Sequence, residues 1–530
     1  MQTITIPKPA TIINSAAKFI FIVVGAVLFN LLFWEEKMAL NAALFFLYAV
    51  GGILYFYPGV FASKKVRWLL LASVISLSMV VFHNTLLSQI SLAVSVLLLA
   101  AYSQYLHNSI LYAGASILQS FLFFVPAFIS SLQQVFFLKK RKPGVGKMIR
   151  LAIFPLLIAG IFLIVYLMAN KVFADVLETA ALKIEWFVNH LVRWVEPQRL
   201  LFLLLGLLIS GGLLVRHIKA PLETVELRKS DDLQRVRRKR KGSSITADLR
   251  QFFLGKLATG TNALKNEYKA GLLCLVLLNG LLLMVNATDV LYVWFGFSYK
   301  PDINWPTFVH EGAGLLVLSI LLAMLLVLFF FRGNLNFFSK NRWLRALAYV
   351  WIAQNAVLAI SVCIRNMYYI QHMGLAYKRV GLFVYVLLVL IGLITIVIKI
   401  QKRKTAYYLW RVNALAAFVI LLVSSCIDWD VAIARYNISK KDSIQSDIWF
   451  LVRMNDHVLP LLQQNKAWIC SLVPTAISKD INRDTRFPPD KCEMIDVRIK
   501  AFLENEKSYS WLSWNWADEN ARKQLQTTIR

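Results

Sequence analysis

The chain has 530 residues, of which 58% are hydrophobic and 16% charged, and a formal net charge of +29. Its mean hydropathy of +0.59 is too high for a soluble protein of this length, which excludes that class. The basic residues fall in short runs between apolar segments, a pattern that orients membrane proteins, so we expect no nucleic-acid partner. The composition therefore predicts an all-α, multi-spanning helical bundle in a lipid bilayer.

Residues 1–147 are expected to form N-terminal membrane hairpins. The first apolar run is too long for a cleaved signal peptide, so we expect it to remain as a signal anchor. A fifth apolar stretch, 110–137, is expected to form a re-entrant or interfacial hairpin, because the basic runs before and after it belong on one face. Four runs of roughly 20 residues are long enough to span, and they begin near Phe19, Leu40, Trp68 and Ile90.

Residues 148–429 are expected to form the main membrane domain. Seven further apolar runs bring the prediction to about eleven spans, with about twelve or thirteen as alternatives. Loop 216–269 is strongly basic, so we place it in the cytoplasm. Its basic residues either bind anionic lipid headgroups or serve only to orient the protein in the membrane. The seven runs are Ile149–Leu167, Leu200–Val215, Ala270–Val290, Gly312–Phe331, Ala346–Cys363, Val380–Ile398 and Leu409–Ile427.

Residues 430–530 form a polar tail that the alternation of loops sends to the outer side of a bacterial inner membrane. Three predicted helices, Ser443–Gln464, Glu493–Asn505 and Trp511–Leu525, are enough for one small helical domain. Three tryptophans near position 514 cannot share one helical face, so we expect contacts with the membrane surface, the rest of the tail or an envelope protein.

Several stretches of this chain resemble the bacterial membrane proteins grouped as domain-of-unknown-function family 4153/4173. The resemblance lies in Met148–Leu177, in HMGLAYKRVGLF (His372–Phe383), in DVAIARYNI (Asp430–Ile438), and in the tail segments SDIWFLVRMNDHVLPLL and WLSWNWADENARKQL. It departs from the family pattern at Ala376 and at FVHEGAG (Phe308–Gly314). The resemblance implies a polytopic cytoplasmic-membrane protein with an outer helical tail and no established activity.

The stretch RNMYYIQHMGLAYKR, from Arg365 to Arg379, joins two apolar runs and carries three cations. On the outer face cations are not explained by the positive-inside bias, so we predict a site for an anionic group there. The alternative is that Asp289, Glu311, Asp428 and Asp430 pair with these cations and tie helix ends together. The predicted ligand-binding residues are Arg365, Tyr368, Tyr369, His372, Lys378, Arg379, Glu311 and His310.

No motif in the sequence indicates a catalytic residue, a metal site or a cofactor. The seven histidines form no HxxxH or HExxH pair, and neither a CxxC motif nor a Gly-rich phosphate loop occurs. Glu35 and Glu36 follow the first span, as do the carboxylates of some membrane transferases that act on lipid-linked sugars. We prefer an ordinary interfacial turn as the explanation of this pair.

We therefore predict a non-enzymatic receptor, scaffold or accessory subunit with an outer surface for an anion or an envelope partner. One alternative is a transporter of a small or lipidic anion that uses the Arg365 cations. Polar residues inside the spans are few, chiefly Gln354, Asn355 and Ser361 in one run, which argues against transport. The second alternative is a lipid-linked sugar transferase.

Cys470 and Cys492 lie in the tail, which is predicted to face an oxidising compartment. We predict that they form a disulfide closing a loop of roughly 20 residues, which stabilises the tail by about 3 kcal/mol; the alternative is two free buried thiols. Mass spectrometry of the non-reduced, alkylated protein is expected to recover the two cysteines as one linked peptide pair. Recovery of both as alkylated thiols would contradict the bridge and the topology behind it.

Overall fold

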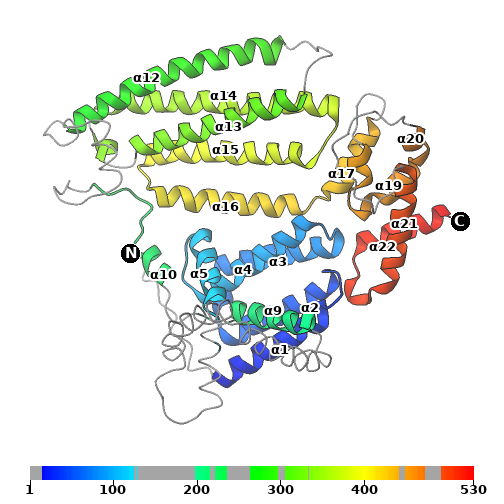
Figure 1. Ribbon diagram of the computed structural model, residues 1–530. Helices are drawn as coiled ribbons and strands as arrows, with labels where there is room; N and C mark the ends of the chain where they lie inside the picture. Colours follow the sequence, from blue (N-terminus) through cyan, green and yellow to red (C-terminus); the bar gives the residue numbers. More distant parts are fainter. Residues whose placement is uncertain are drawn as a thin grey trace, which may run out of the picture. The chain divides into compact units, whose positions relative to one another are not determined.

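The computed structural model describes residues 15–124, 128, 197–214, 216, 221–235, 263–296, 305–331, 334–338, 340–440, 448–471 and 491–529. These ranges are helical and hold no β-strand (Figure 1). The chain forms two compact units, which we describe separately. Unit 1 comprises residues 1–68, 99–105 and 116–220, and unit 2 comprises residues 69–98, 106–115 and 221–530.

Unit 1 is built on the packing of α1 (Ser15–Phe33), α2 (Leu40–Phe56) and α9 (Pro197–Leu214). Small residues allow α1 and α9 to approach closely, as is common between membrane helices. A Cβ on Gly206 of α9 would lie 3.0 Å from the carbonyl oxygen of Ala26 in α1. Near one end of the pair, Nε of Arg199 donates to Oδ1 of Asn30 over 3.3 Å.

The turn between α1 and α2 is organised by Asn41, whose side chain is fully buried. Its Oδ1 accepts from the backbone N–H groups of Ala39 (2.7 Å) and Ala42 (2.8 Å). Its Nδ2 donates to the carbonyl oxygens of Leu32 and Lys37, each over 2.8 Å. One carboxamide thus satisfies four backbone groups where two apolar helices meet.

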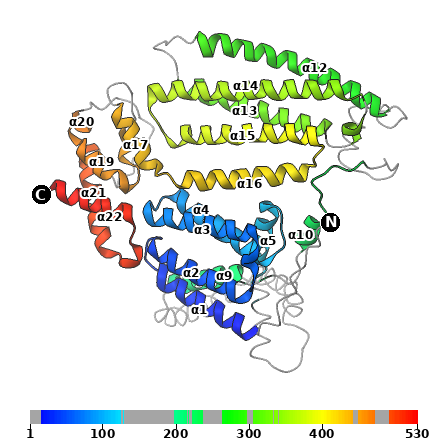
Figure 2. The same ribbon diagram turned by 180° about the vertical axis from the view of Figure 1, so that it is seen from behind.

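Unit 2 contains five long helices that lie side by side: α12 (Ala263–Asp289), α13 (Trp305–Phe330), α14 (Arg342–Met373), α15 (Tyr377–Lys402) and α16 (Ala406–Ser425) (Figures 1 and 2). α14 is central, because it packs on α12, α13 and α15, and α16 packs on α15. The core between them is apolar, with Leu344, Leu358 and Val362 fully buried. The π-helix η3 (Val290–Phe295) continues α12, and η4 (Asn334–Phe337) and α10 (Pro221–Leu227) are short.

Helices α3 (Lys64–Phe82), α4 (Leu86–Gln104) and α5 (Ile110–Leu122) are divided between the two units, and η1 (Val60–Ala62) precedes α3. In the part of α3 and α4 that belongs to unit 2, buried serines face each other. The hydroxyl of Ser76 lies 2.8 Å from that of Ser91 and 3.4 Å from that of Ser95. These pairs satisfy hydroxyl groups that lipid cannot.

The tail follows α16 and forms its own apolar core within unit 2. Ile433, Leu451, Leu459, Leu462, Ile495 and Leu525 are fully buried in it. Cys470 and Cys492 lie with their Cα atoms 5.8 Å apart, within the range that disulfides span, and their sulfur atoms are bonded in the structure. The helices are α17 (Trp429–Ser439), α18 (Ile448–Val452), η5 (Asp456–Val458), α19 (Leu459–Gln464), α20 (Lys466–Ser471), α21 (Lys491–Ser508), η6 (Trp511–Ser513) and α22 (Trp516–Ile529).

Among the described residues, seven helices are long and apolar enough to cross a membrane. They are α3, α4, α9, α12 with η3, α14, α15 and α16, and four shorter apolar helices accompany them: Ala17–Phe33, Leu40–Phe56, Ile110–Leu122 and Leu318–Phe330. This confirms an all-helical protein with several candidate spans, while the predicted number of eleven stays a prediction. The predicted span Ile149–Leu167 and most of residues 123–137 lie outside the described ranges.

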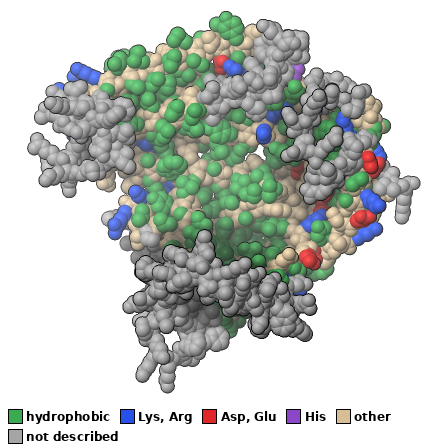
Figure 3. All heavy atoms as spheres, in the orientation of Figure 1, with side chains coloured by type: hydrophobic (Ala, Val, Ile, Leu, Met, Phe, Trp, Pro, Cys, Tyr) green, Lys and Arg blue, Asp and Glu red, His purple; other side chains and the backbone are tan. Residues whose placement is uncertain are grey.

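The surface of unit 2 separates apolar from charged side chains. Apolar side chains cover α12–α16 in the space-filling view, and charged ones gather on the tail at the right (Figure 3). Large apolar residues on α12 and α16 are well exposed, including Leu277 at 65% and Val423 at 59%. Such a belt is compatible with contact to lipid acyl chains.

We predict that Asn41→Ala destabilises the protein by about 1–3 kcal/mol, because the backbone groups of Leu32, Lys37 and Ala39 lose the hydrogen bonds made by the Asn41 side chain. The measurement is the thermal unfolding midpoint of the purified protein in detergent. Leu47→Ala on the same helix is the control, since Leu47 is 66% exposed and its removal opens no internal cavity. Equal shifts for the two variants would contradict the role given to Asn41.

Candidate functional site

The predicted site lies where α14 ends, α15 begins and the tail starts. We call this end of α12–α16 the tail end, and the opposite end, next to residues 221–235, the loop end. Ser361 and Arg365 project from the last turns of α14 toward Asp289, the last residue of α12. The tail follows directly from α16 through Asp428, the residue that caps α17.

Arg365 and Asp289 form a buried ion pair. Nη2 of Arg365 lies 2.5 Å from Oδ1 of Asp289, and the two side chains are 14% and 9% exposed. The second carboxylate oxygen accepts from the hydroxyl of Ser361 over 2.5 Å. The carboxylate therefore neutralises the guanidinium, which agrees with the alternative that acidic residues tie helix ends together.

Arg379 is engaged by the end of α14. Its Nη1 donates to the carbonyl oxygen of Met373 over 2.9 Å and to that of Gly374. The guanidinium lies 4.0 Å from the ring centroid of Tyr369. A cation at the C-terminal carbonyls of a helix is favoured by the helix dipole, so Arg379 caps α14. Gly374 turns the chain there with a φ of 80°.

The remaining predicted residues are spread around this pair. The hydroxyl of Tyr368 donates to the carbonyl oxygen of Val293 in η3 over 3.2 Å. His372 is half-buried and Lys378 is exposed. The side chains of His310 and Glu311 lie outside what the structure describes. The structure thus brings Arg365, Tyr368, Tyr369 and Arg379 to one region, and their binding of an anion stays a prediction.

The sequence reasoning missed a buried histidine, His457, which lies between two carboxylates. Its Nε2 is 3.0 Å from Oδ1 of Asp518, and its Nδ1 is 3.4 Å from Oδ2 of Asp428. The shorter contact is a hydrogen bond, whereas the longer one is an ion-pair distance. We call these three residues the His457 clip, since they join η5, the start of α22 and the start of α17. A lone histidine 61 residues from Asp518 gives no local signal of this arrangement.

Electrostatics favour a charged His457. Burial alone lowers its pKa, but the carboxylates of Asp428 and Asp518 outweigh burial and raise the pKa to about 9. Burial raises the pKa of Asp428, and the contact with His457 reverses this, so that its pKa lies below the ordinary value. The clip is therefore a cation between two anions at neutral pH.

Further polar contacts join the tail to the turn between α14 and α15. Asn437 of α17 accepts from the backbone N–H of Leu375 over 2.6 Å and donates to its carbonyl over 2.9 Å. The hydroxyl of Tyr377 donates to the carboxylate of Asp430. Burial raises the pKa of Asp430, and the nearby negative charge of Asp428 raises this pKa further. Stretches that carry the family resemblance, 372–383 and 430–438, thus meet here.

At the loop end, the start of the predicted cytoplasmic loop is held by Glu226, which is 2% exposed. Its carboxylate lies 2.5 Å from Nδ1 of His107 and accepts from the backbone N–H groups of Asn108 (3.1 Å) and Ser109 (2.7 Å). It also accepts from the hydroxyl of Tyr407. This contact anchors α10 at the N-terminus of α5, where a negative charge is favoured.

No group of three or more His, Cys, Asp or Glu side chains in the described ranges is arranged to hold a metal ion. The glutamates considered for a transferase lie in the α1–α2 turn, where Glu35 is exposed and has a φ of 59°. The backbone of that turn is fixed by Asn41, so the turn has a structural explanation.

The stability contributed by the His457 clip is expected to fall as the pH rises. With a pKa raised from 6.5 to about 9, His457 contributes fully below pH 6.5 and loses this contribution as the pH passes 9, on the order of 3 kcal/mol in all. The measurement is the unfolding midpoint of the purified protein between pH 6 and 9.5. His457→Gln is expected to flatten the profile, while His372→Gln keeps it. A wild-type profile that matches His457→Gln would contradict the role of the clip.

Comparison with known proteins assigns the chain to a family without assigning an activity. The family model described as "Domain of unknown function (DUF4153)" matches residues 23–465. No curated protein matches the chain, and no solved structure matches it. The matched range contains α12–α16, the Arg365–Asp289 pair and two residues of the His457 clip, and ends before Asp518. On this match, the chain belongs to the DUF4153 family.

Proposed function

We propose that this protein is a non-enzymatic receptor, scaffold or accessory subunit of the bacterial inner membrane, whose tail engages an envelope protein on the outer side. The observation that carries the proposal is the way in which the tail is fixed to α14–α16. The Asn437–Leu375 pair and the Tyr377–Asp430 contact join the start of the tail to the turn between α14 and α15, and the His457 clip holds the helices of the tail together. Loosening the tail would leave buried polar groups without partners, so the tail is presented rigidly.

The orientation rests on charge. Lys402, Arg403 and Lys404 lie at the loop end of α15, and Arg342 and Arg345 lie at the loop end of α14. By the positive-inside rule the loop end faces the cytoplasm and the tail end faces outward. The tail then occupies the compartment in which the Cys470–Cys492 bridge is stable.

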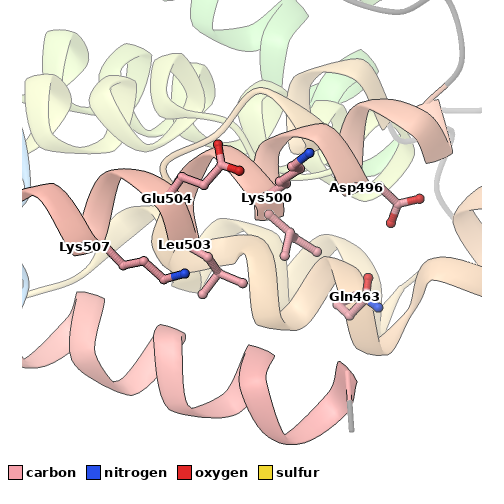
Figure 4. Close-up of a pocket in the computed structure, with 7 residues that line it drawn as sticks. Gln463, Asp496, Lys500, Leu503, Glu504 and Lys507 are labelled. Carbon is pink, nitrogen blue, oxygen red and sulfur yellow. The ribbon is translucent and has the colours of Figure 1, made fainter.

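The tail offers a shallow groove between α19 and α21 (Figure 4). Ile499 and Leu503 supply its apolar floor, and Lys500, Glu504 and Lys507 stand along α21 as a charged edge. An apolar centre with a charged rim is the usual anatomy of a protein–protein contact. We therefore place the partner contact on this face of α21.

The anion alternative is less well supported because the cations invoked for it already have partners. Arg365 is neutralised by Asp289, and Arg379 caps α14 through backbone carbonyl groups. An anion at this site has to displace those contacts, which opposes binding. Lys378 is exposed but is a single, well-hydrated charge.

The test is site-specific photo-crosslinking in cells with a photoreactive residue at position 503, in the groove. Asn505 is the matched control, because it is exposed on the opposite side of α21. We expect a discrete adduct of defined mass at position 503, weakened by Lys500→Glu, and none at position 505.

Equal adducts at positions 503 and 505, or none at either, would contradict the proposal. Native mass spectrometry of the protein in its own lipids tests the anion alternative in parallel. A bound anion that disappears in the Arg365→Ala, Arg379→Ala protein would favour the alternative.

A further inference from the structure

Three carboxamide side chains lie at the interface of α12 and α14, within the membrane-spanning part of unit 2. They are Asn279, Asn286 and Gln354, and we call them the α12–α14 seam. Asn279 and Asn286 are 8% and 6% exposed. The two helices run in the same direction from the loop end to the tail end, so the seam continues toward Asp289 and Arg365. Polar groups at this depth are costly unless each finds a partner, and they often mark a functional path.

The orientation of each carboxamide is fixed by a partner that can only accept. Nδ2 of Asn279 donates to the carbonyl oxygens of Leu275 (2.7 Å) and Leu347 (3.2 Å). Nδ2 of Asn286 donates to the carbonyl oxygen of Gln354 over 3.0 Å. Oδ1 of Asn279 then accepts from Nε2 of Gln354 over 2.9 Å. Turning any of the three would set two acceptors against each other.

Two carboxamide oxygens remain, Oδ1 of Asn286 and Oε1 of Gln354. Both atoms are buried, and neither accepts a hydrogen bond from any described residue. Trp351 lies one turn before Gln354 on the face of α14 that contacts α12, and its Nε1 is likewise buried with no acceptor in the described ranges. These two acceptor oxygens and one N–H donor lie in one region of the seam. A partner that suits them must both donate and accept hydrogen bonds, as a hydroxyl group or a water molecule does.

We propose that the α12–α14 seam is a hydrated crevice that admits water, or the hydroxyl groups of a small polar ligand, from the tail end to the level of Asn286. Asp289 follows Asn286 by three residues, about 4.5 Å of helix rise, and so lies between the crevice and the tail end. The Asp289–Arg365 ion pair forms the polar mouth of the crevice. A metal cation fits less well, because the mouth carries the Arg365 guanidinium and the indole N–H of Trp351 offers no lone pair. The inference is independent of the tail's partner.

The test is the reactivity of a cysteine placed in the seam. Asn286→Cys is introduced into protein whose Cys274, Cys363 and Cys426 have been replaced by alanine, with Cys470 and Cys492 retained. A charged methanethiosulfonate reacts with the thiolate, which forms only in contact with water. The protein is held in nanodiscs of synthetic lipid, so both membrane faces are reachable. Leu283→Cys is the matched control, because Leu283 lies one turn away on α12 and is 61% exposed on the lipid-facing surface.

We expect labelling of Asn286→Cys to be at least about tenfold faster than that of Leu283→Cys, measured by intact mass. Gln354→Cys reports from the opposite helix if the first variant does not fold. Repeating the labelling in native membranes separates the two sources of hydroxyl groups, since unchanged rates indicate water and slower rates indicate a protecting ligand. Rates as slow as those of Leu283→Cys, with full labelling after denaturation, would overturn the proposal.

Discussion

The arrangement of unit 2 depends on one constraint, which is that polar groups carried into the apolar layer by α14 need partners inside the protein. α14 has 32 residues, and its α12-facing side carries Gln354, Ser361 and Arg365 at helical spacing. Asn279 and Asp289 of α12 supply the opposing groups. This matching selects α12 as a parallel neighbour and fixes its register, which apolar packing alone specifies weakly between membrane helices.

The same rule applies at both ends of the bundle. At the tail end, Arg379 satisfies the carbonyls that end α14, and Asn437 satisfies both polar groups of Leu375. At the loop end, Glu226 satisfies backbone groups that begin α5, and Nζ of Lys399 donates to the carbonyl of Phe331 over 2.5 Å. Arg379, a candidate ligand-binding residue in the sequence, therefore acts as a cap of α14 in the structure.

The stretches that resemble the DUF4153 family come together at the tail end and in the tail. The stretches by which the chain resembles the family are far apart in sequence, yet 372–383 and 430–438 meet through Asn437 and Leu375. Two tail stretches, 446–462 and 511–525, meet through His457 and Asp518. The stretches that resemble the family therefore lie at the contact between the tail and α14–α15 and at the contact between helices of the tail. The family model ends at residue 465, so the carboxylate of Asp518 comes from beyond the matched range.

The sequence by itself determined the class of protein and the positions of most helices. Long apolar runs such as Ala270–Val290 and Val380–Ile398 predict spans because a helix of about 20 apolar residues satisfies its own backbone in lipid. Local composition also located the polar tail and the cysteine pair. Only the tertiary structure decided which charges meet. Arg365 and Asp289 are 76 residues apart, and His457 and Asp518 are 61 apart, so no local pattern links them. Helix pairing brings these residues together, and that pairing is set by contacts between distant parts of the chain.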